Sequence, residues 1–559
     1  MEKQEFEDIH NCVIKLRVKP EKRREKVYIG CGAGFGGDRP MAALKLLQRV
    51  EQLNYLVLEC LAERTLADRF QIMLSGGHGY DSRISDWMRL LLPLAVERGT
   101  CIITNMGAMD PPGAQEKVLE IATSLGLSVR VAVTHEVSIK ESGSGPSTEK
   151  SYIMEGSKNL GISTYLGAAP IVECLEKYKP NVIITSRVAD AALFLAPMVG
   201  IGMTSIRLAQ GSLASHLLEC GCQLTGGFFM HPGDKYRNIS FQHLLDISLP
   251  YAEVSCDGEV FVAKAEGSGG VLNFSTCAQQ LLYEIGDPGC LCHSGCAIKF
   301  SVLEQNLHLG SVPDKLLRLV PKFRGWKGWG EISYGGQECV KRAKAAEYLD
   351  QAVEFAKEFT ALYTNGPAGG GGISTGHKKE IILEKQLVGR EHVFWQTGLK
   401  CTDLADSTTH QIALAENLSK THVLQEALLT TKASQDSCLD HLSPEVDVCP
   451  APSGQKIPLY TVCHSRVGDK GNDLNFSIIP HFPLDVERLK LIITPQWVKE
   501  VFSTLLNPSS FPDSVAINKR DQWINEHVKV EIYEVRGIHS LNVRGSKHSR
   551  WWCQLLSED

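Results

Sequence analysis

The chain has 559 residues, of which 43% are hydrophobic and 22% are charged. This composition excludes a wholly disordered chain and leaves apolar material for several cores, in three or four domains of roughly 100–200 residues or in two larger ones. The 64 acidic and 58 basic residues give a net charge of −6, which argues against a general binder of nucleic acids.

The 18 cysteines do not indicate a secreted disulfide scaffold, because several lie in apolar runs where a free thiol packs as a small hydrophobic group. The first residues are highly charged, which is unlike a secretory leader. No apolar run reaches about 18 residues, so we expect no membrane-spanning helix. The sequence therefore predicts a protein of a reducing compartment, most simply the cytoplasm.

The first part of the chain alternates short apolar strands with helices. The predicted strands are continuous apolar runs at 27–31, 55–60, 101–104, 129–133 and 182–185. The predicted helices lie at 41–50, from about 62, and at 85–98, 115–125 and 166–178. Continuous apolar runs are typical of parallel strands that helices cover on both faces. We therefore predict an α/β core at about 26–225 with a doubly wound, mostly parallel sheet.

Residues 226–450 have a mixed α+β character and complete a predicted N-terminal domain at 26–450. Strand-like pieces lie at 258–265 and 297–302, and helices are predicted at 338–362, 378–387 and 403–433. The polar segment 434–455 contains three prolines and is the best candidate for a linker.

The last part of the chain, at 456–556, is predicted to be a separate small α+β unit. Its predicted strands are 458–463, 474–479 and 528–535, and a single long amphipathic helix is expected at about 485–505.

A glycine-rich turn, GCGAGFGGDRP at 30–40, follows the first strand and precedes a helix. The spacing Gly32-x-Gly34-x-x-Gly37 fits a dinucleotide fingerprint, and Glu59 is placed to meet a ribose hydroxyl. Asp38 opposes this interpretation, because its carboxylate would repel a pyrophosphate at the helix start. The alternative is a tight turn capped by Asp38, with Pro40 at the first helical position.

The crevice at the carboxyl ends of the parallel strands is the main candidate site, since ligands bind there in doubly wound folds. Arg187 can clamp a carboxylate or a phosphate, and Asp38, Glu59 or Asp190 can act as a general base if burial raises its pKa. For each residue taken singly, a helix cap or a structural ion pair is the alternative. The candidate catalytic residues are Asp38, Glu59, Arg187 and Asp190, and the candidate binding residues here are Gly34, Gly36, Gly37, Arg39, Asn105 and Ser186; Glu63, His135 and Glu136 lie at the same strand ends.

Two further glycine-rich segments are candidate binding loops. In NGPAGGGG at 365–372, the amides of Gly369, Gly370 and Gly371 could cradle an anion, with a flexible hinge as the alternative. In SRVGDKGNDLN at 465–475, a polar turn between two strands offers Arg466, Asp469 and Lys470. The cysteines at 290–296 lack the paired spacing of a zinc site, so no metal site is predicted, and the cofactor is left unknown.

Taken together, these strings resemble the acyclic terpene utilisation family, AtuA. The matching segments, in chain order, are GAGFGGDRP (32–40), YLVLECLAERTL (55–66), TNMGAMDPPG (104–113), YLGAAPI (165–171), ITSRVADAAL (184–193), SHLLECGCQLTGGFF (215–229), EGSGGVL (266–272), LLYEIGDP (281–288), EISYGG (331–336), NGPAGGGG (365–372) and SRVGDKGNDLN (465–475). The resemblance implies a large N-terminal domain and a small C-terminal domain of ferredoxin-like fold, with a boundary near 452–457. After IHSLNVRG (538–545) the chain departs from the family pattern, so we expect an altered or missing last strand.

The resemblance also implies a role connected with the catabolism of branched acyl-CoA thioesters. With the crevice residues, it predicts an enzyme of small carboxylic acid or branched acyl-CoA metabolism that uses lyase- or hydratase-type acid–base chemistry. The alternatives are an NAD(P)-dependent oxidoreductase and a non-catalytic subunit of an acyl-CoA-metabolising complex. We expect a small-molecule substrate, no nucleic acid and no membrane partner, and we leave a homo-oligomer open.

Overall fold

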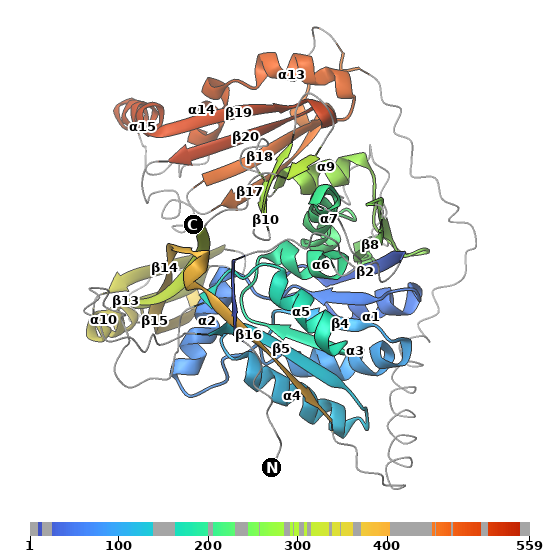
Figure 1. Cartoon of the computed structure of the whole chain (residues 1–559). Helices are drawn as coiled ribbons and strands as arrows, with labels where there is room; N and C mark the ends of the chain where they lie inside the picture. The colour runs from blue at the N-terminus through green and yellow to red at the C-terminus, as the bar shows by residue number, and fades with distance from the viewer. Residues whose placement is uncertain are drawn as a thin grey trace, which may run out of the picture.

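Figure 1 shows the computed structural model of the chain. The residues that the structure describes are 9–13, 25–137, 163–199, 205–229, 244–256, 258–283, 291–293, 296–300, 307–309, 315–334, 338–346, 348–360, 370–402, 450–452, 454, 456–470, 473–504 and 513–547.

A nine-stranded sheet forms the centre of the N-terminal part, in the order β1-β16-β5-β7-β4-β3-β2-β8-β9. Its central strands run parallel to one another. They are β2 (Lys26–Ala33), β3 (Tyr55–Leu58), β4 (Cys101–Thr104), β5 (Arg130–Val137) and β7 (Val182–Thr185). The five predicted strands are confirmed, and β4 and β7, which are buried at every residue, have the predicted bounds.

Helices cover both faces of this sheet, so the predicted doubly wound fold is confirmed. One face packs against α1 (Pro40–Arg49), α3 (Ile84–Arg98) and α4 (Pro111–Ser124). The other face packs against α5 (Ala169–Tyr178), α6 (Asp190–Val199) and α7 (Ser205–Leu218). A further helix, α2 (Glu63–Leu74), follows β3.

The winding direction reverses between the neighbouring strands β4 and β7. The chain leaves β4 for α4 on one face and leaves β7 for α6 on the other face. Such a reversal is a topological switch point, where doubly wound folds open a crevice beyond the carboxyl ends of their strands. The residues that follow β3, β4 and β7 at this edge are Glu59, Asn105 and, one position further, Arg187.

Antiparallel strands from later in the chain extend the sheet on both sides. On one side β8 (Pro250–Ser255) pairs with β2, and β9 (Val260–Lys264) pairs with β8. On the other side β16 (Phe394–Cys401) pairs with β5, and β1 (His10–Asn11) pairs with β16. The sheet therefore does not end near residue 225, where the α/β core was expected to stop.

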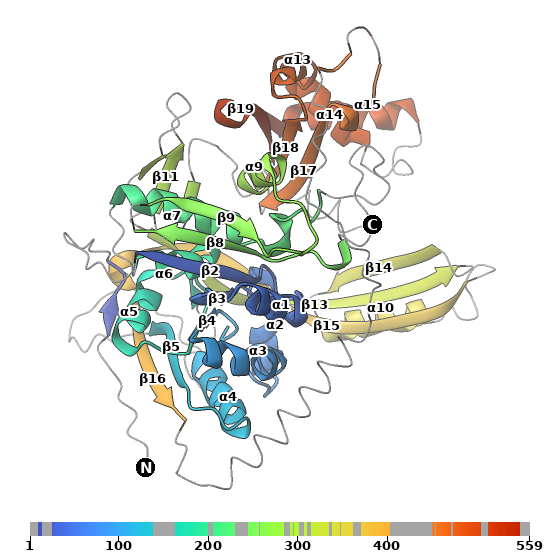
Figure 2. The same cartoon turned by 90° about the vertical axis from the view of Figure 1, so that its right-hand side faces the viewer.

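A three-stranded arm projects from this body, with α10 (Leu349–Thr360) packed on it (Figure 2). Its strands are β13 (Lys315–Tyr334), β14 (Glu338–Ala346) and β15 (Gly370–Gly389), and the short β6 (Ser163–Thr164) pairs with the base of β13. The helix predicted at 338–362 is wrong over its first part, which is β14, and the helix predicted at 378–387 is wrong because that segment lies within β15. Both segments are rich in helix-forming residues, but long strand pairing with β13 overrides that preference.

The remaining described elements of the N-terminal part are shorter. They are η1 (Gly221–Gln223), α9 (Phe274–Tyr283), a small sheet of β10 (Leu291–His293), β11 (Cys296–Phe300) and β12 (Leu307–Leu309), and η2 (Arg390–His392). The predicted helix at 403–433 and most of the predicted linker at 434–455 lie outside the described residues.

The C-terminal unit is a four-stranded antiparallel sheet in the order β17-β18-β20-β19. Its elements are η3 (Leu459–Thr461), β17 (Cys463–Lys470), β18 (Asp473–Pro480), η4 (Pro483–Asp485), α13 (Val486–Ile492), α14 (Pro495–Thr504), α15 (Ser514–His527), β19 (Val528–Val535), η6 (Arg536–Ile538) and β20 (Ser540–Lys547).

Two expectations for this unit are corrected. The single helix predicted at 485–505 is two helices, because Pro495 can begin a helix but cannot continue one. The strand predicted at 458–463 is η3 followed by the start of β17. The strand that was expected to be altered or missing follows residue 545 and lies, beyond residue 547, outside the described residues; the matched segment at 538–545 contains the start of β20, which pairs with both β18 and β19.

Within the described residues, no helix is long and apolar enough to cross a membrane. The cysteines whose side chains the structure describes are free thiols.

Candidate active site

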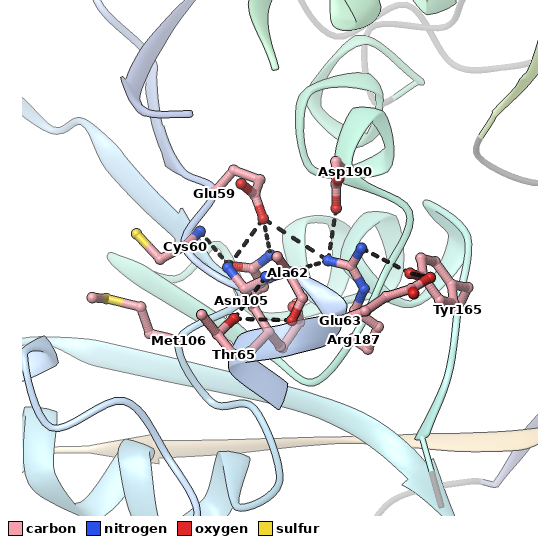
Figure 3. A network of polar contacts seen from close by, with 12 residues as sticks. Glu59, Cys60, Ala62, Glu63, Thr65, Asn105, Met106, Tyr165, Arg187 and Asp190 are labelled. Atoms are coloured by element: carbon pink, nitrogen blue, oxygen red, sulfur yellow. Dashed lines mark hydrogen bonds and ion pairs between the residues drawn. The ribbon is translucent and has the colours of Figure 1, made fainter. Parts of the chain in front are cut away.

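The residues that follow β3, β4 and β7 converge on one polar network at the switch point (Figure 3). Glu59, Asn105 and Arg187 are each almost completely buried. Asp190, at the start of α6, joins the network and keeps 38% of its side-chain surface exposed. The network therefore runs from the buried edge of the sheet to the molecular surface.

Glu59 is held by its own turn and by the neighbouring strand end. Its Oε1 atom accepts hydrogen bonds from the Leu61 amide at 3.0 Å and from Asn105 Nδ2 at 2.9 Å. Asn105 is oriented in turn, because its Oδ1 atom accepts a hydrogen bond from the Cys60 amide at 2.8 Å. In the described part of the chain, every hydrogen bond of this carboxylate reaches Oε1, which leaves Oε2 for a ligand or for water.

Burial strongly favours the neutral form of Glu59. Desolvation, helped by the negative charge of Asp190, raises the pKa of Glu59 from the usual 4.5 to about 8. The positive charge of Arg187, whose Nη1 atom lies 3.9 Å from Oε1, and the hydrogen bonds from Asn105 and Leu61 oppose this rise. A carboxyl group with such a pKa can give up or take a proton near neutral pH.

Arg187 uses most of its guanidinium on neighbouring groups. Its Nη1 atom donates to Asp190 Oδ1 at 2.8 Å and to the Leu61 carbonyl, and its Nη2 atom donates to the Tyr165 hydroxyl at 3.0 Å. The guanidinium carbon also lies 4.4 Å from the centre of the Tyr165 ring. The Nε atom is buried and has no hydrogen-bond partner among the described residues.

A second line of contacts joins the site to the base of the arm. The Tyr165 hydroxyl donates to Glu63 Oε1 at 2.8 Å, and Lys385 of β15 lies 2.9 Å from Glu63 Oε2. The sequence interpretation missed Tyr165 and Lys385 as site residues. Nothing in the sequence places Lys385 here, because its position depends on the pairing register of β13 with β15.

Asp38 lies apart from this network, in the glycine-rich turn. Its Oδ2 atom accepts a hydrogen bond from the Gly34 amide at 2.7 Å. Burial raises the pKa of Asp38, while hydrogen bonds from the Gly34 and Phe35 amides oppose the rise. A Cβ atom at Gly34 would lie 2.4 Å from the backbone of Cys220, so the chain itself fills the space beside the turn. The tight turn capped by Asp38 is therefore the arrangement that the structure contains, with Pro40 at the start of α1.

The other predicted residues of this turn and crevice take separate places. Gly36 packs close to the Cys60 carbonyl, Gly37 packs against the Phe35 ring, and Arg39 is exposed at the start of α1. Ser186 is buried beside Arg187, and its hydroxyl has no partner among the described residues.

His135 and Glu136, at the end of β5, are not part of the network around Glu59. Glu136 Oε1 accepts a hydrogen bond from Arg318 of β13 at 2.7 Å, and Glu136 Oε2 accepts one from the Thr164 amide at 2.8 Å. These contacts attach the base of the arm to the sheet.

The glycine-rich segment at 365–372 lies away from Glu59. Gly370 and Gly371 are in β15 and pair with the end of β13. They are therefore part of a strand and not of a flexible loop. At about 3.3 Å per residue, they lie about 50 Å along β15 from Lys385. Gly369 lies outside the described residues.

Arg466, Asp469 and Lys470 are in β17, which forms the predicted hairpin with β18. Arg466 is buried where the C-terminal unit meets α9. Its guanidinium carbon lies 3.5 Å from the centre of the Tyr283 ring, and its Nη1 atom donates to Gln280 Oε1 at 3.1 Å. These contacts join the two parts of the chain.

Among the residues that the structure describes, no group of three or more His, Cys, Asp or Glu side chains could hold a metal ion. Several residues of the 290–296 cluster lie outside that range.

The fold and the site define an α/β protein of two parts, with a protonatable carboxyl group at the switch point of a doubly wound sheet. The model of the family described as acyclic terpene utilisation family protein AtuA matches residues 27–349, and the model of the AtuA ferredoxin-like domain matches residues 457–546. The chain therefore belongs to the acyclic terpene utilisation family. Neither a curated protein nor a solved structure matches it significantly.

Proposed function

We propose that this protein is a cytoplasmic enzyme that performs lyase- or hydratase-type acid–base chemistry on a small carboxylic acid or a branched acyl-CoA thioester. The observation that carries the proposal is the buried Glu59 carboxyl, whose pKa is raised to about 8 at the switch point of the sheet. The resemblance to the AtuA family supplies the substrate class.

Glu59 has the properties of a proton donor that can be protonated again after each reaction. At neutral pH it is mostly protonated, and after it donates a proton its pKa allows it to recover one. Because the Leu61 amide and Asn105 hold Oε1, Oε2 is the atom that faces the reaction. In a dehydration, Glu59 gives this proton to the substrate hydroxyl group, whose C–O bond breaks so that it leaves as water. The Glu59 carboxylate then takes the proton from the carbon beside the acyl carbonyl as the double bond forms, which restores the acid; hydration runs through the same steps in reverse.

Arg187 orients the site and gives it a fixed positive charge. Asp190, one of its side-chain partners, keeps 38% of its side-chain surface exposed. A substrate carboxylate can take the place of Asp190 on the guanidinium without disturbing the hydrogen bond to Tyr165. The substrate carboxylate brings its own negative charge to the place of the Asp190 charge, so the pKa of Glu59 stays raised while the substrate is bound.

The geometry of the glycine-rich turn disfavours the oxidoreductase alternative. In dinucleotide-binding folds the amides of such a turn receive a pyrophosphate. Here the Gly34 amide is bonded to Asp38, and the backbone at Cys220 occupies the adjoining space.

The proposal can be tested without knowing the exact reaction. The protein is incubated in D₂O with linear and branched acyl-CoA thioesters and with short carboxylic acids, and the products are analysed by mass spectrometry. We expect deuterium uptake or a change of one water mass with at least one substrate, and Glu59→Gln should lower the rate by about a hundredfold or more. The matched control is Glu120→Gln, because Glu120 is an exposed surface carboxylate.

Two results would contradict the proposal. One is the absence of exchange or water addition with every substrate tested. The other is an unchanged rate in Glu59→Gln. If the protein stimulates a co-purifying acyl-CoA enzyme equally well with Glu59 or with Gln, the role is that of a non-catalytic subunit.

A further inference from the structure

A small basic pocket lies between α1 and the segment that leads into β8, outside the network around Glu59. Its volume is about 60 Å³. Residues of α1 line one side of it, and residues 245–248 line the other. The charged side chains in its lining are Arg39, Lys45, Arg49 and Asp246.

One carboxylate serves several cations here. Asp246 accepts from Lys45 at 2.6 Å through Oδ1 and from Arg49 at 2.9 Å through Oδ2. Arg39 donates to the Leu245 carbonyl at 3.4 Å, and Lys264 lies close enough to interact electrostatically with Arg49 and Asp246. The positive charge of the cluster therefore exceeds what Asp246 can neutralise.

The start of α1 adds to this positive potential. The first turn of the helix contains no acidic residue, and Arg39 at its N-cap position gives no side-chain cap. The positive end of the helix dipole thus faces a cation, although an acidic group is normally favoured there. The Asp38 carboxylate, which also lies near Arg39, is bonded to the backbone amides of the glycine-rich turn.

The α1 sequence also places two like charges one helical turn apart. Lys45 and Arg49 have the i, i+4 spacing, at which like charges destabilise a helix. Their side chains keep 47% and 33% of their surface exposed, so both can reach a ligand. Burial, followed by the charge of Arg49, lowers the pKa of Lys264. These are the marks of a cation cluster that is short of negative charge.

We propose that this pocket binds the phosphate group of an anionic small molecule, either a phosphate monoester or a diphosphate. Its volume corresponds to about two water molecules, which is on the scale of one phosphate group. The planar guanidinium of Arg49 can hold two phosphate oxygens, and Lys45 supplies a mobile point charge. The proposal goes beyond the acid–base function and does not depend on Glu59.

The test measures binding of inorganic phosphate, pyrophosphate and adenosine 3′,5′-bisphosphate to the full chain by calorimetry at low ionic strength. We expect saturable binding of at least one of these ions. In the double variant Lys45→Ala/Arg49→Ala the affinity should fall by about tenfold or more, because two charge-assisted contacts are lost. The matched control is Lys357→Ala/Arg488→Ala, which removes one exposed Lys and one exposed Arg, each beside an acidic residue elsewhere.

A second variant separates a ligand site from a structural ion pair. Asp246→Asn removes the internal carboxylate that competes for Lys45 and Arg49. If the pocket is a phosphate site, this variant binds pyrophosphate more tightly than the native protein, and added salt weakens the gain. Tighter binding of the nucleotide than of pyrophosphate would assign a nucleotide ligand, and equal binding would assign a free phosphate or diphosphate.

The proposal is overturned by either of two results. The first is the absence of saturable binding of all three ions at concentrations up to about 5 mM, because a dissociation constant above that value is too weak for a metabolite site. The second is equal loss of affinity in the double variant and in its control, together with no gain in Asp246→Asn.

Discussion

Replacing Glu59 by Gln tests whether the carboxyl at the switch point is protonated in the folded protein. Glutamine has nearly the same shape, and its carbonyl oxygen can accept the hydrogen bonds from the Leu61 amide and Asn105 that Oε1 now receives. It cannot ionise. The variant therefore removes the titration of this group while keeping the contacts that hold it.

The sign and size of the effect follow from the pKa of Glu59, which is 4.5 in an ordinary environment and about 8 in the folded protein. Between these values the folded protein keeps a proton that the unfolded chain has released. This tighter binding of the proton stabilises the folded protein. The stabilisation is complete below pH 4.5 and is lost as the pH rises through about 8. At about 1.4 kcal/mol per pH unit, the whole effect is about 5 kcal/mol, of which about 3 kcal/mol has been lost at pH 7.

The assay is urea unfolding of the native protein and of Glu59→Gln between pH 5 and pH 9. We expect similar stabilities at pH 5 and a growing advantage of the variant as the pH rises. The control is Glu63→Gln, because burial pulls the pKa of Glu63 upward but hydrogen bonds from Lys385 and Tyr165 hold it below its usual value. That control should be less stable than the native protein by a constant amount between pH 5 and pH 9, because Glu63 stays ionised over this range and loses its stabilising effect only below its usual pKa of 4.5. Parallel pH profiles for the native protein and Glu59→Gln would refute the reasoning.

Two further predictions concern packing. Gly34→Ala should lower the free energy of unfolding by about 1–3 kcal/mol, because the new Cβ would lie 2.4 Å from the Cys220 backbone. The control Gly537→Ala should have little effect, because no atom lies within 4 Å of its new Cβ. Thermal denaturation compares the two variants, and equal shifts of the melting temperature would contradict the packing described. Arg466→Ala should weaken the attachment of the C-terminal unit to the rest of the chain, because it removes the stacking on Tyr283. Small-angle scattering should then show a larger radius of gyration. An unchanged radius would show that other contacts hold the two parts together.

The sequence predicts the central sheet well because its strands are continuous apolar runs, which only burial on both faces explains. From those strands alone, Glu59, Asn105 and Arg187 could be placed at one edge. The sequence also indicates that Asp38 caps its own turn, and the structure contains that cap. The order of the strands in the sheet could not be predicted in this way, because no local sequence pattern shows that β7 lies between β4 and β5.

The arm could not be predicted in the same way. The residues of β14 and the second half of β15 include many Lys, Glu and Ala, which favour helices, and their strand conformation comes from pairing with β13. The contact of Lys385 with Glu63 depends on this register and is invisible to local patterns. The break between α13 and α14, just before Pro495, could have been predicted from the sequence, because a proline inside a helix removes a hydrogen bond and collides with the preceding turn.

The most direct test of the central claim is the protonation state of Glu59 itself. Infrared difference spectra between the native protein and Glu59→Gln isolate the carbonyl stretch of a protonated carboxylic acid at this one position. We predict that this band is present at neutral pH and disappears with a midpoint near pH 8. A band that is already absent at neutral pH, with a midpoint near the ordinary glutamate pKa of 4.5, would contradict the account.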